Sequence, residues 1–182
     1  MQAYNFDELI TRQNTDSIKW DKFNHKTIPL WVADMDFKSP PCITKSMKQR
    51  LNHEIYGYTH APENFRENIS LYLHEQYQWE VDPEWIVVLP SVVSALYSIG
   101  INCTNSASHV ITPKPVYHHL RIAAENSGRS YDEAQLDVIN NRILLTQSSL
   151  QRVVKKNTDL LYFCNPHNPG GTVYSEKELK NI

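Results

Sequence analysis

The sequence lacks the features that mark membrane proteins and nucleic-acid-binding proteins. It contains no apolar run of membrane-spanning length, and no basic stretch followed by an apolar core opens it. Its 18 lysines and arginines face 20 aspartates and glutamates, for a formal net charge of −2, so it offers no positive field for a polyanion. We therefore expect a cytoplasmic globular protein that binds neither nucleic acid nor a membrane.

Cysteine is scarce as well. The three residues Cys42, Cys103 and Cys164 are odd in number and widely spaced, which indicates neither a disulfide framework nor a zinc site. No internal repeat, low-complexity run or flexible linker is present. A length of 182 residues accommodates one domain, or one domain with part of another.

The most informative stretch lies near the carboxyl end. The apolar run Leu160 to Cys164 is typical of a buried strand in a parallel sheet, and two Asn-Pro dipeptides and a Gly-Gly pair then force the backbone into a loop. Open α/β sheets bind ligands at the carboxyl ends of their strands, so a rigidly held asparagine here is a candidate ligand group. The alternative is an ordinary junction between a strand and a loop.

A second short apolar run, Leu30 to Ala33, predicts a strand that ends at Asp34 and Asp36. Two acids at this spacing can form a metal pair, but no histidine or further acid lies at ligand spacing. The favoured interpretation is that both carboxylates accept hydrogen bonds from nearby backbone amides and fix the turn.

The stretch Leu89 to Gly100 predicts a strand, a tight turn and the start of a helix. Unpaired amides at a helix amino terminus can hold a phosphate group, and Ser91 and Ser94 can add a cap or a hydroxyl. Plain capping of a core helix is the alternative.

The adjacent residues His118 and His119 could be read as a metal-binding pair. Adjacent histidines on a helix, however, are expected to point apart.

The remaining elements follow from periodicity and turn signals. Helices are expected at 41–53, 62–79, 116–126, 150–156 and from Ser175, with one helical turn near Asn5, and strands at 85–89, 109–112, 130–136 and 142–145. Asn140 and Asn141 suit a hairpin turn, and Ser175 with Glu178 has the spacing of a capping box.

Two motifs resemble a known family. Asn165-Pro-His-Asn-Pro-Gly170 resembles the Asn-Pro-x-Asn-Pro-x-Gly loop of fold-type-I enzymes that use pyridoxal 5′-phosphate (PLP). Trp31-Val-Ala-Asp-Met-Asp-Phe37, followed by Pro40-Pro41, resembles the opening segment of MalY/PatB-type cystathionine β-lyases. The resemblance implies an α/β, PLP-dependent transferase-like three-layer sandwich with a mostly parallel sheet. It covers essentially the whole chain but only about the first half of a family member.

The resemblance also assigns roles to individual residues. Asn168 would bond the phenolic oxygen of the cofactor ring, and Tyr117, in Pro115-Val-Tyr117, would stack on the pyridine face. The amides of Val92 and Val93 would hold the phosphate, although Ser91 stands where the family usually has glycine. The backbone near Ala33 would approach the substrate carboxylate, and Tyr58 would reach the partner subunit's cofactor or substrate.

The implied activity is α,β-elimination from cystathionine or a related cysteine S-conjugate, which releases a thiol, pyruvate and ammonia. An aminotransferase on the same scaffold and a non-catalytic remnant or interaction protein are the alternatives. No lysine here matches the family's Schiff-base position, so the chain as given is expected to be inactive. Residues 1–50 would form an arm and small-domain segment, residues 51–182 the first part of the PLP-binding domain, and the complete protein a homodimer.

Overall fold

The computed structural model describes residues 4–24 and 26–182. Contacts divide the chain into two compact units, Met1–Glu63 and Asn64–Ile182, which we call the amino-terminal and carboxyl-terminal units. This boundary lies beyond the one at residue 50 that the sequence suggested, and the assignment of the first segment to a small domain stays a prediction. No helix in the described ranges is both long and apolar enough to cross a membrane.

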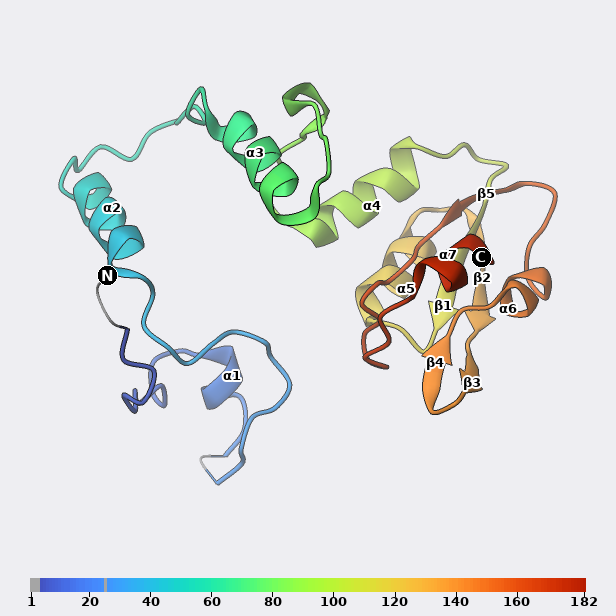
Figure 1. The fold of residues 1–182 in the computed structure, drawn as a ribbon, viewed down its shortest axis with the longest axis horizontal. Helices are drawn as coiled ribbons and strands as arrows, with labels where there is room; N and C mark the ends of the chain where they lie inside the picture. Colours follow the sequence, from blue (N-terminus) through green and yellow to red (C-terminus); the bar gives the residue numbers. More distant parts are fainter. Residues whose placement is uncertain (1–3, 25) are drawn as a thin grey trace. The chain divides into compact units, whose positions relative to one another are not determined.

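The described residues of the amino-terminal unit form two helices, α1 (Ile18–Asp21) and α2 (Pro41–Leu51) (Figure 1). α2 begins at Pro41 as predicted, because proline suits a first helical position that has no use for an N–H donor. The helical turn expected near Asn5 is wrong, since the first turn lies at α1. The strand expected at Leu30 to Ala33 is also wrong: among the described residues no strand pairs with this run to satisfy its backbone groups.

The carboxyl-terminal unit is built on a parallel sheet in the order β2-β1-β5 (Figure 1). Its strands are β1 (His109–Lys114), β2 (Ser130–Gln135) and β5 (Thr158–Leu161). The central strand β1 is buried on both faces, with Ile111 only 1% exposed, as its β-branched run predicts. Burial of such a side chain contributes about 1.5–3 kcal/mol relative to leaving it in water.

Two helices cover one face of this sheet, α4 (Val92–Asn102) and α5 (His118–Asn126). Their buried side chains form one cluster with residues of β1 and of the β5 segment: Val110, Leu120, Ala123, Ala124 and Tyr162, with Leu96 and Tyr97 packed beside them. α5 ends at Asn126 with Ser127 as its C-cap, and the following Gly128 has a φ of 71°, which confirms the predicted glycine stop.

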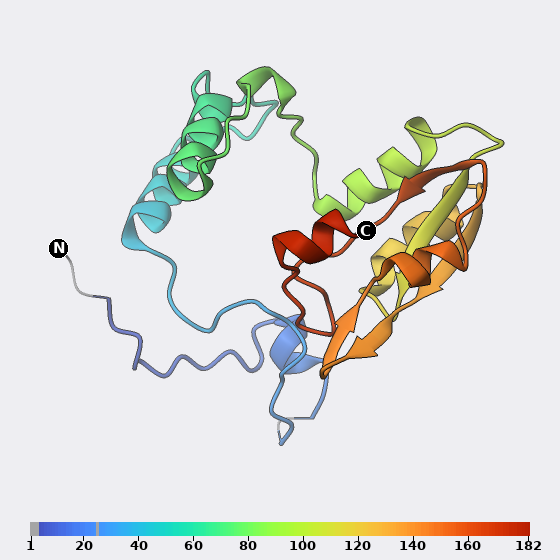
Figure 2. The ribbon, with the colours of Figure 1, turned by 45° about the vertical axis from the view of Figure 1, so that its right-hand side comes forward.

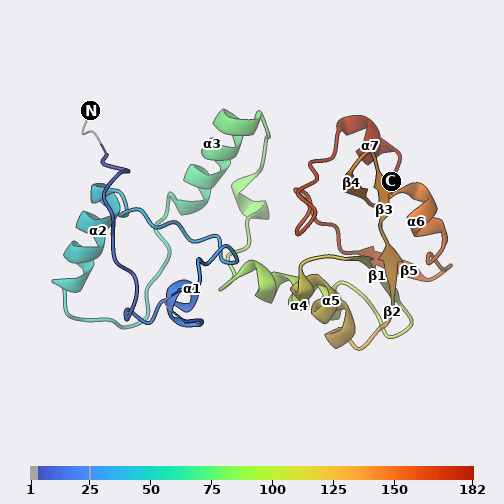
Figure 3. The same cartoon turned by 90° about the horizontal axis from the view of Figure 1, so that it is seen from below.

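The other face carries a hairpin and two short helices, so this unit has three layers (Figure 3). The elements are β3 (Asp137–Ile139), β4 (Arg142–Leu144), α6 (Gln147–Gln151) and α7 (Glu176–Lys180). The hairpin turn lies at Asn140 and Asn141, whose φ angles of 50° and 61° match the predicted turn. Figure 2 shows the hairpin (orange) extending from the end of β2, and the capping box at Ser175 is formed.

Three further expectations fail. α6 ends at Gln151, so most of the helix expected at 150–156 is not formed, and β5 ends at Leu161, so the strand expected to reach Cys164 stops three residues earlier.

The third failure lies between α3 (Phe65–Tyr77) and α4. The helix α3 forms as predicted, but residues 85–89 do not form a strand. A short 3₁₀ helix, Pro83–Trp85, occupies the start of that run, and Val87, Val88 and Leu89 after it are exposed. A β-branched sequence favours a strand only where another strand pairs with it, and none does so among the described residues.

Candidate functional site

Two loops meet at the carboxyl ends of neighbouring parallel strands. The loop after β1 carries Tyr117, and the loop after β5 carries Asn168. The backbone N–H of Tyr117 donates to the carbonyl oxygen of Asn168 at 2.8 Å. The structure therefore brings these two predicted residues side by side, at the edge where parallel sheets bind ligands.

The two asparagines of the loop have different surroundings. Asn165 fixes the loop, because its Oδ1 accepts the backbone N–H of Tyr174 at 3.2 Å. The exposed side chain of Asn168 has no hydrogen-bond partner among the described residues, although its backbone N–H donates to Cys164 Sγ at 3.4 Å. The peptide bonds from each asparagine to the following proline are cis. Both asparagines are exposed, but of the two only Asn168 has both polar side-chain atoms unengaged within the described residues.

Tyr117 precedes the first residue of α5, and its side chain is 36% exposed. Its ring lies 4.8 Å from the ring of His118 and 5.2 Å from that of His119, measured between centroids. The expectation that the two histidines point apart is wrong, since their rings lie 4.2 Å from each other. In the described part of the chain, however, no group of three metal-ligating side chains occurs here or elsewhere.

The predicted phosphate end is the start of α4. Ser91 has an extended backbone with a φ of −164°, so this position does not need glycine. Its hydroxyl caps the helix by accepting the N–H of Ser94 at 3.1 Å. Helix geometry leaves the first-turn amides of Val92 and Val93 without intrahelical acceptors, so both can bind an anion.

In the amino-terminal unit the Trp31–Phe37 segment is held by cations of the preceding arm. Asp36 accepts hydrogen bonds from Lys19 at 2.8 Å, from the Trp20 indole at 2.8 Å and from Arg12 at 2.6 Å. These donors, Lys19 foremost, hold the pKa of the Asp36 carboxyl well below its usual value. Arg12 also pairs with Asp34 at 2.5 Å. The carboxylates thus bind arm cations rather than the local amides that the sequence suggested.

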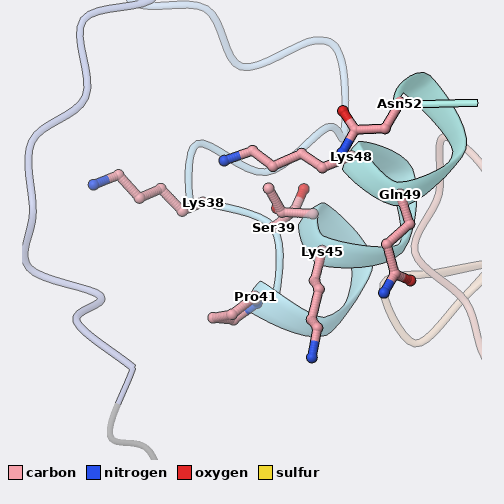
Figure 4. A pocket seen from close by; sticks show the side chains of 8 residues that line it. Lys38, Ser39, Pro41, Lys45, Lys48, Gln49 and Asn52 are labelled. Atoms are coloured by element: carbon pink, nitrogen blue, oxygen red, sulfur yellow. The ribbon is translucent and has the colours of Figure 1, made fainter. Parts of the chain in front are cut away.

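Ala33 and Tyr58 both belong to the amino-terminal unit and are exposed. The same unit has a hollow of about 780 Å³ beside α2, lined in part by Lys38, Lys45 and Lys48 (Figure 4). Figure 4 shows that the three lysine side chains extend separately rather than converging on one point, so they do not form a preformed anion-binding site. The hollow contains none of the residues predicted for the cofactor.

Sequence reasoning missed two side chains that support the site. The Tyr162 hydroxyl donates to the carbonyl of Leu96 at 2.7 Å and ties α4 to the sheet, and burial raises the pKa of Tyr162. His167 is buried within the Asn-Pro loop itself. A tyrosine inside an apolar run and a histidine between two Asn-Pro pairs are the available signals, but neither identifies a partner far away in the sequence.

Comparisons with known proteins identify the family and the fold. The sequence pattern of the family described as aminotransferase class I and II matches residues 25–182. PatB, a cystathionine β-lyase from Bacillus subtilis (strain 168), is 33% identical over 184 residues, which cover 98% of this chain and 48% of PatB.

Two solved structures are also similar. OvoB has a TM-score of 0.88 at 35% identity, covering 98% of this chain and 47% of OvoB. Cystalysin from Treponema denticola, whose crystal structure contains PLP, has a TM-score of 0.86 at 30% identity, covering 98% of this chain and 47% of cystalysin. The chain therefore spans about half the length of the curated relatives it matches. The predicted fold-type-I class is confirmed.

Proposed function

The chain belongs to the class I and II aminotransferase family, and from that premise we propose that it supplies the cofactor-holding part of a PLP-dependent C–S β-lyase. The observation that carries the proposal is the 2.8 Å hydrogen bond from the Tyr117 amide to the Asn168 carbonyl. It joins the backbones of two residues, one with an aromatic ring and one with an unengaged side-chain amide, at the carboxyl edge of a parallel sheet. That edge is where this class of sheet binds its ligands.

The donor set fits the chemistry of PLP. The phosphate dianion suits the free amides of Val92 and Val93 and the positive potential of the α4 amino terminus. A flat pyridine ring suits Tyr117, whose position is fixed by its backbone. The phenolic oxygen suits the side-chain N–H of Asn168. When bound, PLP withdraws electrons from the α-carbon of an attached amino acid, which supports both β-elimination and transfer of the amino group.

The substrate side of the proposal rests on the amino-terminal unit. The Asp36 hydrogen bonds hold the segment that contains Ala33, whose backbone would approach the substrate carboxylate. Tyr58 would contact the cofactor or substrate of a second subunit, so the complete protein would be a homodimer. The lysine that bonds the cofactor would not be any lysine of this chain, and the chain alone would not turn over a sulfur amino acid.

An aminotransferase remains the second candidate, because the family pattern that matches residues 25–182 is named for that activity. The cofactor contacts proposed here serve either reaction. The whole protein supplied with cystathionine and PLP would release pyruvate and ammonia if it is a lyase. It would instead consume a 2-oxo acid, without free ammonia, if it is an aminotransferase.

The contrast between the two asparagines tests the cofactor proposal. PLP bound to the Asn168→Ala protein should show an absorption spectrum with an altered pH dependence, because a donor to the ring oxygen is lost. Asn165→Ala is the comparison variant: it removes the bond to Tyr174 that fixes the loop and should lower the melting temperature, but it keeps the Asn168 donor and with it the wild-type pH dependence of the spectrum. An unaltered spectrum in Asn168→Ala across pH removes Asn168 from the site.

Tyr117 is tested by affinity. Aromatic stacking contributes about 0.5–1.5 kcal/mol, so Tyr117→Ala should weaken PLP binding by roughly 2- to 10-fold. Tyr117→Phe keeps the ring and should retain affinity. Equal affinity in the wild type and in Tyr117→Ala contradicts the stacking role.

A further inference from the structure

The loop that carries Asn168 is folded around one buried histidine. The side chain of His167 is only 3% exposed. Its Nδ1 accepts the backbone N–H of Gly170 at 3.1 Å, and its Nε2 lies 3.0 Å from the carbonyl oxygen of Pro115. An amide N–H only donates and a carbonyl only accepts, so these partners assign the ring proton to Nε2. Both ring nitrogens are thus satisfied.

This one ring bridges the two loops of the candidate site. Pro115 lies two residues before Tyr117, and Gly170 lies two residues after Asn168. The backbone of His167 also closes its own loop, because its N–H donates to Thr172 and its carbonyl accepts from Gly171, each at 2.7 Å. The ring and the Tyr117–Asn168 backbone bond are therefore two links between the same pair of loops.

The space around the ring is filled. A β-carbon added at Gly170 would lie 2.6 Å from His167 Nδ1 and 3.1 Å from the Cβ of Ile143. Real β-carbons essentially never approach so closely, so the loop packs against the ring only because residue 170 is glycine. The ring is held from both sides and has little freedom to move.

We propose that His167 is a positioning residue that sets the separation and orientation of Tyr117 and Asn168. It does not touch the cofactor in this proposal; it acts through the Pro115 and Gly170 backbones on the residues that do. This inference rests on the PLP-binding role proposed for Tyr117 and Asn168. Losing the bridge should let the two loops separate. The Tyr117 ring and the side-chain N–H of Asn168 would then no longer be held at the spacing that one cofactor ring requires.

Three substitutions separate the contacts of the ring. His167→Gln can place a side-chain N–H near the position of Nε2 and keep the bond to Pro115, whereas His167→Asn can replace only the Nδ1 acceptor for Gly170. His167→Leu removes both. If the bridge to Pro115 positions Tyr117, the dissociation constant of PLP should rise roughly tenfold in His167→Asn and His167→Leu, and less in His167→Gln.

His109 supplies a matched control. It is equally buried, at 0% exposure, and both of its ring nitrogens are bonded, to Thr158 at 2.7 Å and to Asp132 at 3.1 Å. It lies at the amino end of β1, the opposite end of the strand from Pro115. His109→Asn should therefore lower the melting temperature at least as much as His167→Asn while leaving PLP affinity unchanged.

The experiment measures PLP dissociation constants and melting temperatures of the whole protein and its variants, together with amide hydrogen exchange of the apoprotein at Tyr117 and Gly170. We expect faster exchange at both amides in His167→Leu. We also expect His167→Asn to lower PLP affinity less in the Tyr117→Ala protein than in the wild type, because only its effect on Asn168 is then left. Wild-type affinity in His167→Asn, or equal losses of affinity and stability in both histidine variants, overturns the inference. A wild-type protein that does not bind PLP overturns the proposed function, and this inference with it.

Discussion

Gly100 offers a test of how α4 is held on the sheet. The helix passes so close to Tyr162 that a β-carbon at Gly100 would lie 2.6 Å from the tyrosine hydroxyl and 3.2 Å from the Cβ of Ser127. Tyr162 is only 4% exposed, and its hydroxyl is bonded to the Leu96 carbonyl at 2.7 Å. Gly100→Ala must therefore displace a buried, hydrogen-bonded ring or shift the helix.

Opposing effects set the size of the change in the free energy of unfolding. Alanine favours a helix interior over glycine by about 1 kcal/mol. Overpacking a close contact costs about 1–3 kcal/mol, and loss of the tyrosine hydrogen bond about 0.5–1.5 kcal/mol. The net expectation is a destabilisation of about 2 kcal/mol, opposite in sign to helix propensity alone.

Urea unfolding of the whole protein, followed by far-ultraviolet circular dichroism, measures this change. Tyr162→Phe removes the hydroxyl that the new methyl group would meet, so Gly100→Ala should be close to neutral in the Tyr162→Phe background. The two substitutions should therefore couple by about 2 kcal/mol. A Gly100→Ala protein that is more stable than wild type by about 1 kcal/mol would refute the close packing of α4 on Tyr162.

Two further predictions concern a cap and a carboxylate. Ser91→Gly should reduce helix stability by only a few tenths of a kcal/mol. It should change PLP affinity less than about twofold, because the extended backbone at Ser91 does not require glycine. Tenfold tighter PLP binding by Ser91→Gly in a titration would contradict this prediction. Arg142 lowers the pKa of Glu178 from its ordinary 4.5 to about 2. The stability that this ion pair contributes is fully present above the ordinary pKa and is lost as pH falls toward about 2. The unfolding free energy of Glu178→Gln should therefore decrease less steeply than that of the wild type between about pH 5 and about pH 3. Equal slopes for Glu178→Gln and wild type in urea titrations would exclude this contribution.

Local signals predicted the parts of the fold that depend on local chemistry. Proline at the start of α2, the hairpin asparagines Asn140 and Asn141, and the capping box at Ser175 all act within a few residues of themselves. The failed strands at 30–33 and 85–89 have the composition of strands. A strand, however, requires a partner distant in the sequence, and composition does not say whether one is present.

The candidate site shows the same division. The motifs led to Tyr117 and Asn168, and the structure places them together, while their roles stay predictions. The two side chains that support the site, Tyr162 and His167, were not predictable, because each bonds a residue far away in the sequence. Tyr162 bonds Leu96, 66 positions away, and His167 bonds Pro115, 52 positions away. Buried polar side chains of this kind are recognised only once their acceptors are known.

The two ends of the central strands indicate where a ligand belongs. At the amino end the polar side chains satisfy one another: His109 bonds Thr158 and Asp132, and Lys155 pairs with Asp132 at 2.6 Å and lowers its pKa. At the carboxyl end the side chain of Asn168 and the hydroxyl of Tyr117 have no hydrogen-bond partner within residues 4–24 and 26–182. Both residues are exposed, so water satisfies these groups, and a ligand can displace that water without breaking a hydrogen bond within the protein. The asymmetry therefore favours the carboxyl end as the binding end, independently of any motif.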